Sequence, residues 1–106
     1  MIKYGSDHMT ELRFLSFDAT MERRDDQWVD IVLRPTLDER TPVPDDLIQF
    51  TVYVICTVDG TVVQMIPQDE DCDCEYQLTF SEKEQVQAYI MQPQIQEAIS
   101  RLTIPQ

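Results

Sequence analysis

The chain has 106 residues, of which 20 are Asp or Glu and 8 are Lys or Arg, so its formal net charge is −12. A chain of this length forms one domain with a modest core, and its 42% hydrophobic content is that of a folded protein. The excess negative charge disfavours direct binding to nucleic acid or to anionic membranes. Glycine occurs only at positions 5 and 60, which excludes a Gly-rich phosphate-binding loop.

The first eight residues, Met1 to His8, resemble a vector-derived leader, because Gly-Ser and His-Met junctions are common cloning scars. We therefore leave residues 1–8 out of the fold and expect residues 9–106 to form a single globular domain. Without the leader the chain has no histidine, which excludes a Ser-His-Asp triad, a histidine base and imidazole metal ligands. No apolar run approaches the roughly 20 residues that cross a bilayer, so we expect a soluble, cytoplasmic protein.

The first half of the chain predicts two strands and a long loop. An apolar-rich segment predicts a strand over 11–18, and alternating β-branched residues predict a second over 27–34. Pro35 ends the second strand in this interpretation, because proline cannot donate to a sheet ladder. The charged residues 18–26 connect the two strands as a hairpin. The proline-rich, acidic segment 35–46 is predicted to be a loop.

The clearest pattern is the alternation of apolar residues over 48–58, which predicts a long strand with one core face. The Asp-Gly pair at 59–60 predicts a two-residue hairpin into a strand over 61–66. In that register Val54 faces Met65 and Cys56 faces Val63, so the apolar residues of the two strands lie on the same face of the sheet. A fifth strand is predicted over 74–80, where Tyr76, Leu78 and Phe80 alternate with polar residues.

Helical patterns fill the C-terminal part of the chain. Ser81 and Glu84 form a Ser-x-x-Glu capping box, and apolar residues then recur at helical spacing on both sides of Pro93. The sequence therefore predicts an α+β fold: a mostly antiparallel sheet of about five strands with a kinked or split C-terminal helix packed on one face. A small closed barrel with a helical plug is the alternative.

The three cysteines, Cys56, Cys72 and Cys74, do not have the spacing or number of a structural zinc site, so we expect no metal and no cofactor. Asp69, Asp71 and Asp73 resemble the start of an EF-hand loop, but Cys74 stands where its glycine is required. Carboxylates are abundant, yet no pair stands out as a general acid and base. We therefore expect no enzymatic activity, and a metal protein or an enzyme is the weaker alternative.

Residues 69–75, Asp-Glu-Asp-Cys-Asp-Cys-Glu, are the most acidic segment of the chain. If the fifth strand extends back to Cys72, strand parity puts both thiols on the buried face and three carboxylates in a ladder on the solvent face. We expect an acidic binding surface there and at neighbouring loop carboxylates. The candidate binding residues are Asp69, Glu70, Asp71, Asp73, Glu75, Asp45, Asp46, Asp38 and Glu39.

A strong negative field attracts basic surfaces, so the sequence favours a non-catalytic acidic module that binds a basic protein. Inhibitors, nucleic-acid mimics and immunity-type proteins work in this way. Two alternatives remain open. The acidity could serve only solubility, or the domain could form a homo-oligomer or an assembly component through apolar surface, including Met65 and Met91.

Overall fold

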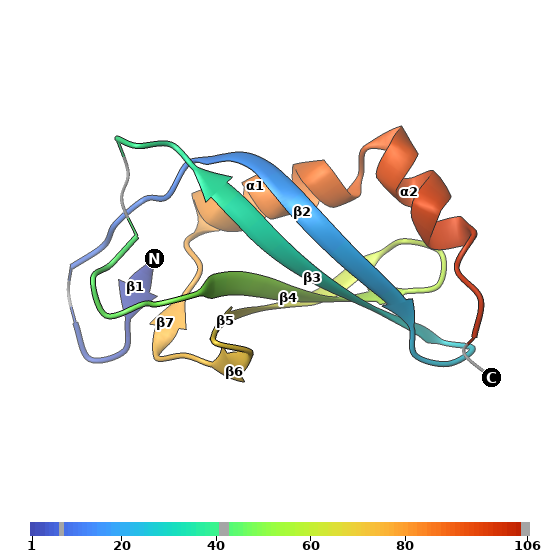
Figure 1. Cartoon of the computed structure of the whole chain (residues 1–106), viewed down its shortest axis with the longest axis horizontal. Helices are drawn as coiled ribbons and strands as arrows, with labels where there is room; N and C mark the ends of the chain where they lie inside the picture. Colours follow the sequence, from blue (N-terminus) through green and yellow to red (C-terminus); the bar gives the residue numbers. More distant parts are fainter. Residues whose placement is uncertain (7, 41–42, 105–106) are drawn as a thin grey trace.

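The computed structural model describes residues 1–6, 8–40 and 43–104 and has the expected α+β fold (Figure 1). A five-stranded antiparallel sheet has the order β2-β3-β4-β5-β6, and β1 and β7 form a separate two-stranded sheet. The elements are β1 (Ile2–Lys3), β2 (Phe14–Arg23), β3 (Trp28–Leu37), β4 (Phe50–Thr57), β5 (Val62–Asp69), β6 (Cys72–Asp73), β7 (Tyr76–Gln77), α1 (Phe80–Ile90) and α2 (Pro93–Ser100).

The core lies between one face of the large sheet and the two helices, as the sequence predicted. Alternate residues of the two central strands are fully buried: Val29, Ile31 and Leu33 of β3, and Val52, Val54 and Cys56 of β4. Val86 and Ile90 of α1 and Ile99 of α2 pack against them. This alternation follows from the two-residue period of a strand, which sends successive side chains to opposite faces.

The split C-terminal helix is confirmed, but its N-cap is not the predicted one. Thr79 caps α1: its hydroxyl accepts a hydrogen bond from Glu82 N–H at 3.2 Å, and Glu82 Oε1 accepts one from Thr79 N–H at 2.8 Å. Ser81 and Glu84, the predicted capping pair, lie inside the helix instead. Pro93 begins α2. Proline is tolerated there because the first N–H groups of a helix have no acceptor within the helix.

The first hairpin is longer than predicted. β2 begins at Phe14 and continues to Arg23, so most of the predicted connection 18–26 is strand. Pro35 does not end β3, which runs on to Leu37 with Pro35 opposite Phe17 of β2. β4 pairs with β3 only as far as Leu33, so Pro35 lies where β3 has a free side. A proline is tolerated there because no neighbouring strand needs its N–H.

The β4–β5 hairpin keeps the predicted pair of Val54 with Met65, but the register shifts between Ile55 and Cys56. Cys56 therefore pairs with Val62, not Val63. Gly60 has φ +88°, the left-handed conformation that the predicted Asp-Gly turn requires. Gln96 of α2 closes over this turn, since its Nε2 donates to Gly60 O at 3.1 Å.

The start of the chain belongs to the fold, which corrects our exclusion of residues 1–8 from it. Met1 is 1% exposed, and its terminal ammonium lies 2.6 Å from Glu82 Oε2. β1 pairs with β7, with Ile2 opposite Gln77 and Lys3 opposite Tyr76. The origin of these residues in a cloning leader stays a prediction.

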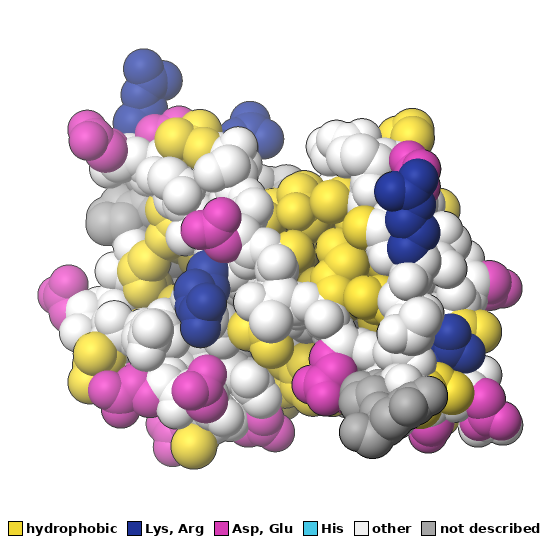
Figure 2. Space-filling view, turned by 45° about the vertical axis from the view of Figure 1, so that its right-hand side comes forward, with side chains coloured by type: hydrophobic (Ala, Val, Ile, Leu, Met, Phe, Trp, Pro, Cys, Tyr) yellow, Lys and Arg dark blue, Asp and Glu magenta, His cyan; other side chains and the backbone are white. Residues whose placement is uncertain are grey.

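Surface charge is spread widely over the molecule. On the face shown in Figure 2, apolar side chains gather in a hollow and acidic side chains lie around the periphery. Neither α1 nor α2 has the length and apolar character of a membrane-spanning helix, and the same holds for the rest of the described chain.

Candidate functional site

The acidic segment forms a tight hairpin, and the fifth strand does not extend back through it to Cys72 without a break. β5 ends at Asp69, Glu70 and Asp71 make the turn with φ +52° and +66°, and the chain returns as the two-residue strand β6. β7 then joins the other sheet. The predicted strand over 74–80 is confirmed only at Tyr76 and Gln77, which form β7, because Phe80 already begins α1. The carboxylate ladder is wrong: Asp71 lies in the turn, and the break between β6 and β7 keeps Asp73 and Glu75 from sharing one continuous strand.

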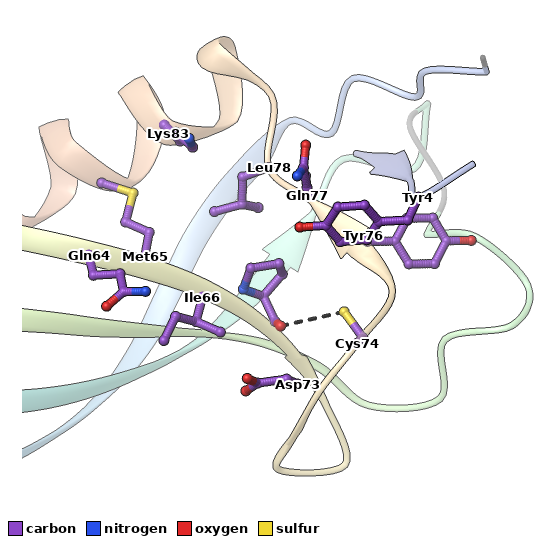
Figure 3. A pocket seen from close by; sticks show the side chains of 11 residues that line it. Tyr4, Gln64, Met65, Ile66, Asp73, Cys74, Tyr76, Gln77, Leu78 and Lys83 are labelled. Carbon is purple, nitrogen blue, oxygen red and sulfur yellow. Dashed lines mark hydrogen bonds between the residues drawn. The ribbon is translucent and has the colours of Figure 1, made fainter. Parts of the chain in front are cut away.

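The predicted burial of both thiols fails for the same reason. Cys72 is exposed on the hairpin, whereas Cys74 is half-buried, with its Sγ 3.5 Å from Pro67 O (Figure 3). Burial raises the pKa of the Cys74 thiol, and the carboxylates of Asp69 and Asp73 raise it further. Cys56 is buried in the core as predicted, and burial raises its pKa to about 11.

The fold brings four of the predicted binding residues together around one shallow hollow of about 250 Å³. Asp46 comes from the loop before β4, Asp69 from the end of β5, Asp73 from β6 and Glu75 from the next link. We call these four side chains the acidic hollow. Segments about 25 residues apart in sequence meet here because the β5–β6 hairpin folds back beside the 43–49 loop.

Lys3 and Tyr76 hold Asp46 in place at this hollow. Lys3 Nζ lies 2.8 Å from Asp46 Oδ2 and 4.0 Å from Glu75 Oε2, and Tyr76 donates its hydroxyl to Asp46 Oδ1 at 2.6 Å. The hydrogen bond from Lys3, joined by that from Tyr76, lowers the pKa of Asp46. The same ammonium lies 5.8 Å from the centre of the Tyr76 ring, within cation–π range. Two carboxylates that line the hollow thus already contact one ammonium group, although Lys3 itself does not line it.

The other three carboxylates of the hollow differ in the hydrogen bonds that they already accept. Asp69 Oδ1 accepts hydrogen bonds from Ile48 N–H at 2.9 Å and Gln49 N–H at 2.6 Å, so its role is partly structural. Asp73 accepts one hydrogen bond from Gln68 Nε2 at 3.1 Å. Asp73 and Glu75 are exposed, so they are free to meet a partner.

The remaining predicted residues lie outside the hollow. Glu70 and Asp71 project from the tip of the β5–β6 hairpin, and Asp45 is exposed beside Asp46. Asp38 and Glu39 lie in the turn after β3 and do not line the hollow; Asp38 Oδ1 accepts a hydrogen bond from Arg40 N–H at 3.0 Å. Of the nine candidate binding residues, four therefore line one hollow, and Glu70 and Asp71 adjoin it at the hairpin tip. Asp38 and Glu39 lie apart from it.

Sequence reasoning missed Lys3 and Tyr76 as parts of this site. Lys3 was discarded with the leader, and Tyr76 was placed in a strand core, whereas its hydroxyl reaches Asp46. Nothing local marks either residue, because both meet Asp46 through β1–β7 pairing. Within residues 1–6, 8–40 and 43–104, no three His, Cys, Asp or Glu side chains are grouped so that they could hold a metal ion.

A second, larger hollow of about 350 Å³ adjoins the first. Asp73, Cys74 and Tyr76 line both, and Met65, Leu78 and Lys83 extend this one towards α1 (Figure 3).

Comparison of the chain with models of protein families, with curated proteins and with solved structures finds no significant match. Function therefore has to be argued from the geometry alone.

Proposed function

We propose that this protein is a non-catalytic, acidic protein-binding module whose acidic hollow and adjoining hairpin tip take a basic surface of a partner protein. The observation that carries the proposal is the meeting of Asp46, Asp69, Asp73 and Glu75 around one hollow. Among the described residues, Lys3 is the cation that forms an ion pair with this group, and it contacts two of the four carboxylates, Asp46 and Glu75. Four carboxylates and one ammonium leave a local excess of negative charge that a second Lys or Arg can neutralise.

The way Lys3 is bound supports a lysine or arginine as the ligand. Its ammonium is held by a carboxylate and by the face of Tyr76, which together suit a cationic side chain and not an anion. The pair is exposed, so it adds little to stability. The pair shows instead that Asp46 and Glu75, at the rim of the hollow, can contact one ammonium group together. The hairpin tip adds the carboxylates of Glu70 and Asp71.

The wider charge of the chain favours the same class of partner. A net charge of −12 steers basic proteins towards the molecule and repels nucleic acid. Inhibition of a nucleic-acid-binding protein, as by a nucleic-acid mimic or an immunity-type protein, is the activity that this chemistry fits. No catalytic role is part of this proposal, since Asp46, Asp73 and Glu75 are exposed to solvent.

The test separates a specific acidic surface from general acidity. One variant, Asp71→Asn, Asp73→Asn and Glu75→Gln, removes three of the five negative charges of residues 69–75. Its matched control, Asp18→Asn, Glu22→Gln and Asp26→Asn, makes the same change in charge on the β2–β3 hairpin at the opposite edge of the sheet.

Both variants and the unmodified chain are used to capture partners from native lysate at about 0.05 and 0.3 M salt, where screening differs strongly. We expect a basic protein to be retained at low salt by the unmodified chain and the control, and to be lost from the hairpin variant and at high salt. If the control loses the partner equally, the acidity acts through net charge alone. A partner that is not basic contradicts the proposal.

A further inference from the structure

An apolar groove between α1 and β5 is a second surface feature, separate from the acidic hollow. It has a volume of about 410 Å³ and is lined by Met65 of β5 and, on and just after α1, by Phe80, Lys83, Glu84, Ala88 and Met91. Phe80 is 78% exposed and Met91 50% exposed. We had placed Phe80 in a strand core, but it begins α1 on the side that faces solvent. Large apolar side chains exposed together mark an interaction site.

The edge of the sheet beside this groove is only partly covered. β6 pairs with β5 at Gln68 and Asp69 alone, and Cys74 N–H adds a bond to Pro67 O at 3.4 Å. In the described part of the chain no strand pairs with the outer side of β5 before Pro67. β5 therefore leaves most of its length open on one side, next to the α1–β5 groove.

The open side carries main-chain groups that can pair. Pro67 lies opposite Val52 and has no N–H, so the two cannot form a hydrogen-bonded pair of the ladder. Hydrogen-bonded and non-hydrogen-bonded pairs alternate, so Met65, opposite Val54, is also in a non-hydrogen-bonded pair. Its N–H and C=O thus point away from β4, towards the open side, where a further strand would meet them.

The two edges of the large sheet differ in how they are protected. The outer strand β2 carries Asp18, Glu22 and Arg23, and charged residues on an edge discourage pairing with another chain. From Val62 to Gln68, β5 carries no charged residue at all, and Val63 is 54% exposed. β5 is therefore the edge without charged side chains, which is unusual in a chain of net charge −12; the bulge at Val63 and Pro67 are the features that interrupt it.

Charge identifies the occupant. The groove contains one positive and one negative side chain, Lys83 and Glu84, and neither forms an ion pair with another described residue. A basic partner would gain nothing from a surface with no net charge. A second copy of this chain related by a two-fold axis would instead offer its Glu84 to Lys83 and its Lys83 to Glu84 if the two grooves face each other.

We propose that β5 pairs antiparallel with β5 of a second copy about a two-fold axis near Gln64 and Met65, and that Phe80 and Met91 of both copies fill the α1–β5 grooves. Such a pairing extends the sheet continuously across the dimer and hides its neutral edge. Pairing about Gln64 places Val63 opposite the partner's Met65 and avoids Pro67, which has no N–H to offer. The paired residues Gln64 to Ile66 line the larger hollow, which shares Asp73, Cys74 and Tyr76 with the acidic hollow. Asp46, Asp69 and Glu75 line neither the larger hollow nor the groove, so they stay open for a basic partner.

The oligomeric state of the full chain tests this proposal. Sedimentation equilibrium over a wide concentration range should show a monomer–dimer equilibrium. Val63→Lys and Phe80→Lys should each weaken the dimer at least about tenfold, because a charge would be buried at the neutral edge or in the groove. Leu15→Lys is the matched control: Leu15 is 63% exposed on β2, the other edge strand, and its replacement should leave the dimer unchanged.

A charge exchange provides an independent readout that does not disturb the strand. Lys83→Glu and Glu84→Lys should each weaken the dimer, and the double variant should restore it. Raising salt from about 0.05 to 0.5 M should strengthen the dimer, since it screens the repulsion between two chains of like net charge. The complex with a basic partner should respond to salt in the opposite sense, so the two proposals fail separately.

Three results would overturn the inference. The first is a monomer at every concentration, and the second is a dimer that Leu15→Lys weakens as much as Val63→Lys does. The third is a charge-exchange double variant no better than the single ones. Circular dichroism of each variant shows whether it is folded, and if Val63→Lys is not, the charge exchange decides.

Discussion

Glu82 is the buried charge on which the N-terminal half of the fold depends most directly, and its replacement by alanine should be severely destabilising. The side chain is 0% exposed. Its Oε2 accepts hydrogen bonds from Leu12 N–H at 2.9 Å and from the Met1 ammonium at 2.6 Å, and its Oε1 accepts one from Thr79 N–H at 2.8 Å. It thus joins the start of the chain, the segment before β2 and the cap of α1.

The magnitude follows from the donors that Glu82→Ala leaves unsatisfied. Each of the two buried N–H groups costs about 1–3 kcal/mol when its acceptor is removed. The Met1 ammonium loses its ion-pair partner, and breaking a buried ion pair costs about 3–5 kcal/mol in other proteins. Allowing for water entering the space, we expect a loss of at least about 4 kcal/mol from a total stability that is about 5–15 kcal/mol in small domains.

Urea unfolding followed by Trp28 fluorescence measures this loss. Glu97→Ala is the control, because Glu97 is an exposed acidic residue of α2 that lies outside the groove and pairs only with the exposed Arg101, so its replacement should change the free energy of unfolding by less than about 0.5 kcal/mol. The loss of unfolding free energy for Glu82→Gln should lie between those of the other two variants, since glutamine keeps one acceptor oxygen but turns an amide N–H₂ towards backbone donors. A Glu82→Ala protein within about 1 kcal/mol of the unmodified chain would refute the reasoning.

Three further outcomes are expected. Cys72 should react with a thiol reagent at pH 8 in the folded protein, whereas Cys56 should react only on unfolding, because it is buried and its pKa is about 11; mass spectrometry of the labelled sites checks this. Thr51→Val should be neutral or stabilising by up to about 1 kcal/mol in urea unfolding, because the buried Thr51 hydroxyl has no hydrogen-bond partner among the described residues. The hydrogen bond from Arg24 lowers the pKa of Asp30, so the pair stabilises the protein above the ordinary pKa of an aspartate, and this stabilisation is lost as pH falls. The thermal midpoint of Arg24→Gln should therefore lie below that of the unmodified chain at neutral pH, and the two midpoints should converge below about pH 4. A difference that persists at about pH 2 would contradict the pairing.

The strands and the core faces could be predicted because they depend on local period. Val29, Ile31 and Leu33, like Val52, Val54 and Cys56, alternate with more exposed residues, and burial follows this alternation in the structure. The positive φ of Gly60 was equally predictable, since an Asp-Gly turn requires it. These features need only a few consecutive residues to specify them.

The choice of helix cap could not be made in the same way. Two overlapping motifs, Thr79-x-x-Glu82 and Ser81-x-x-Glu84, satisfy the capping-box pattern equally. Only the tertiary structure separates them: Glu82 is drawn inward because Leu12 N–H also donates to it. A contact between residues 70 positions apart has no local signature.

The candidate site shows the same limit more sharply. The composition of residues 69–75 predicted an acidic surface, but the ladder inferred from strand parity was wrong, because the turn at Glu70 and Asp71 reverses the chain. The hollow depends on Asp46 meeting this hairpin, and on Lys3 reaching Asp46 from β1. Both arise from pairing between distant segments.

The sequence by itself thus determined the class of fold, the core faces of the central strands, the split of the C-terminal helix at Pro93 and the strong negative charge. Only the tertiary structure decided that Met1 to Lys3 belong to the fold, that four carboxylates surround one hollow, and that β5 has an open, neutral edge. The physical reason is the range of the interactions. Side-chain period and turn conformation act over a few residues, whereas strand order and buried ion pairs join residues that the chain alone does not place together.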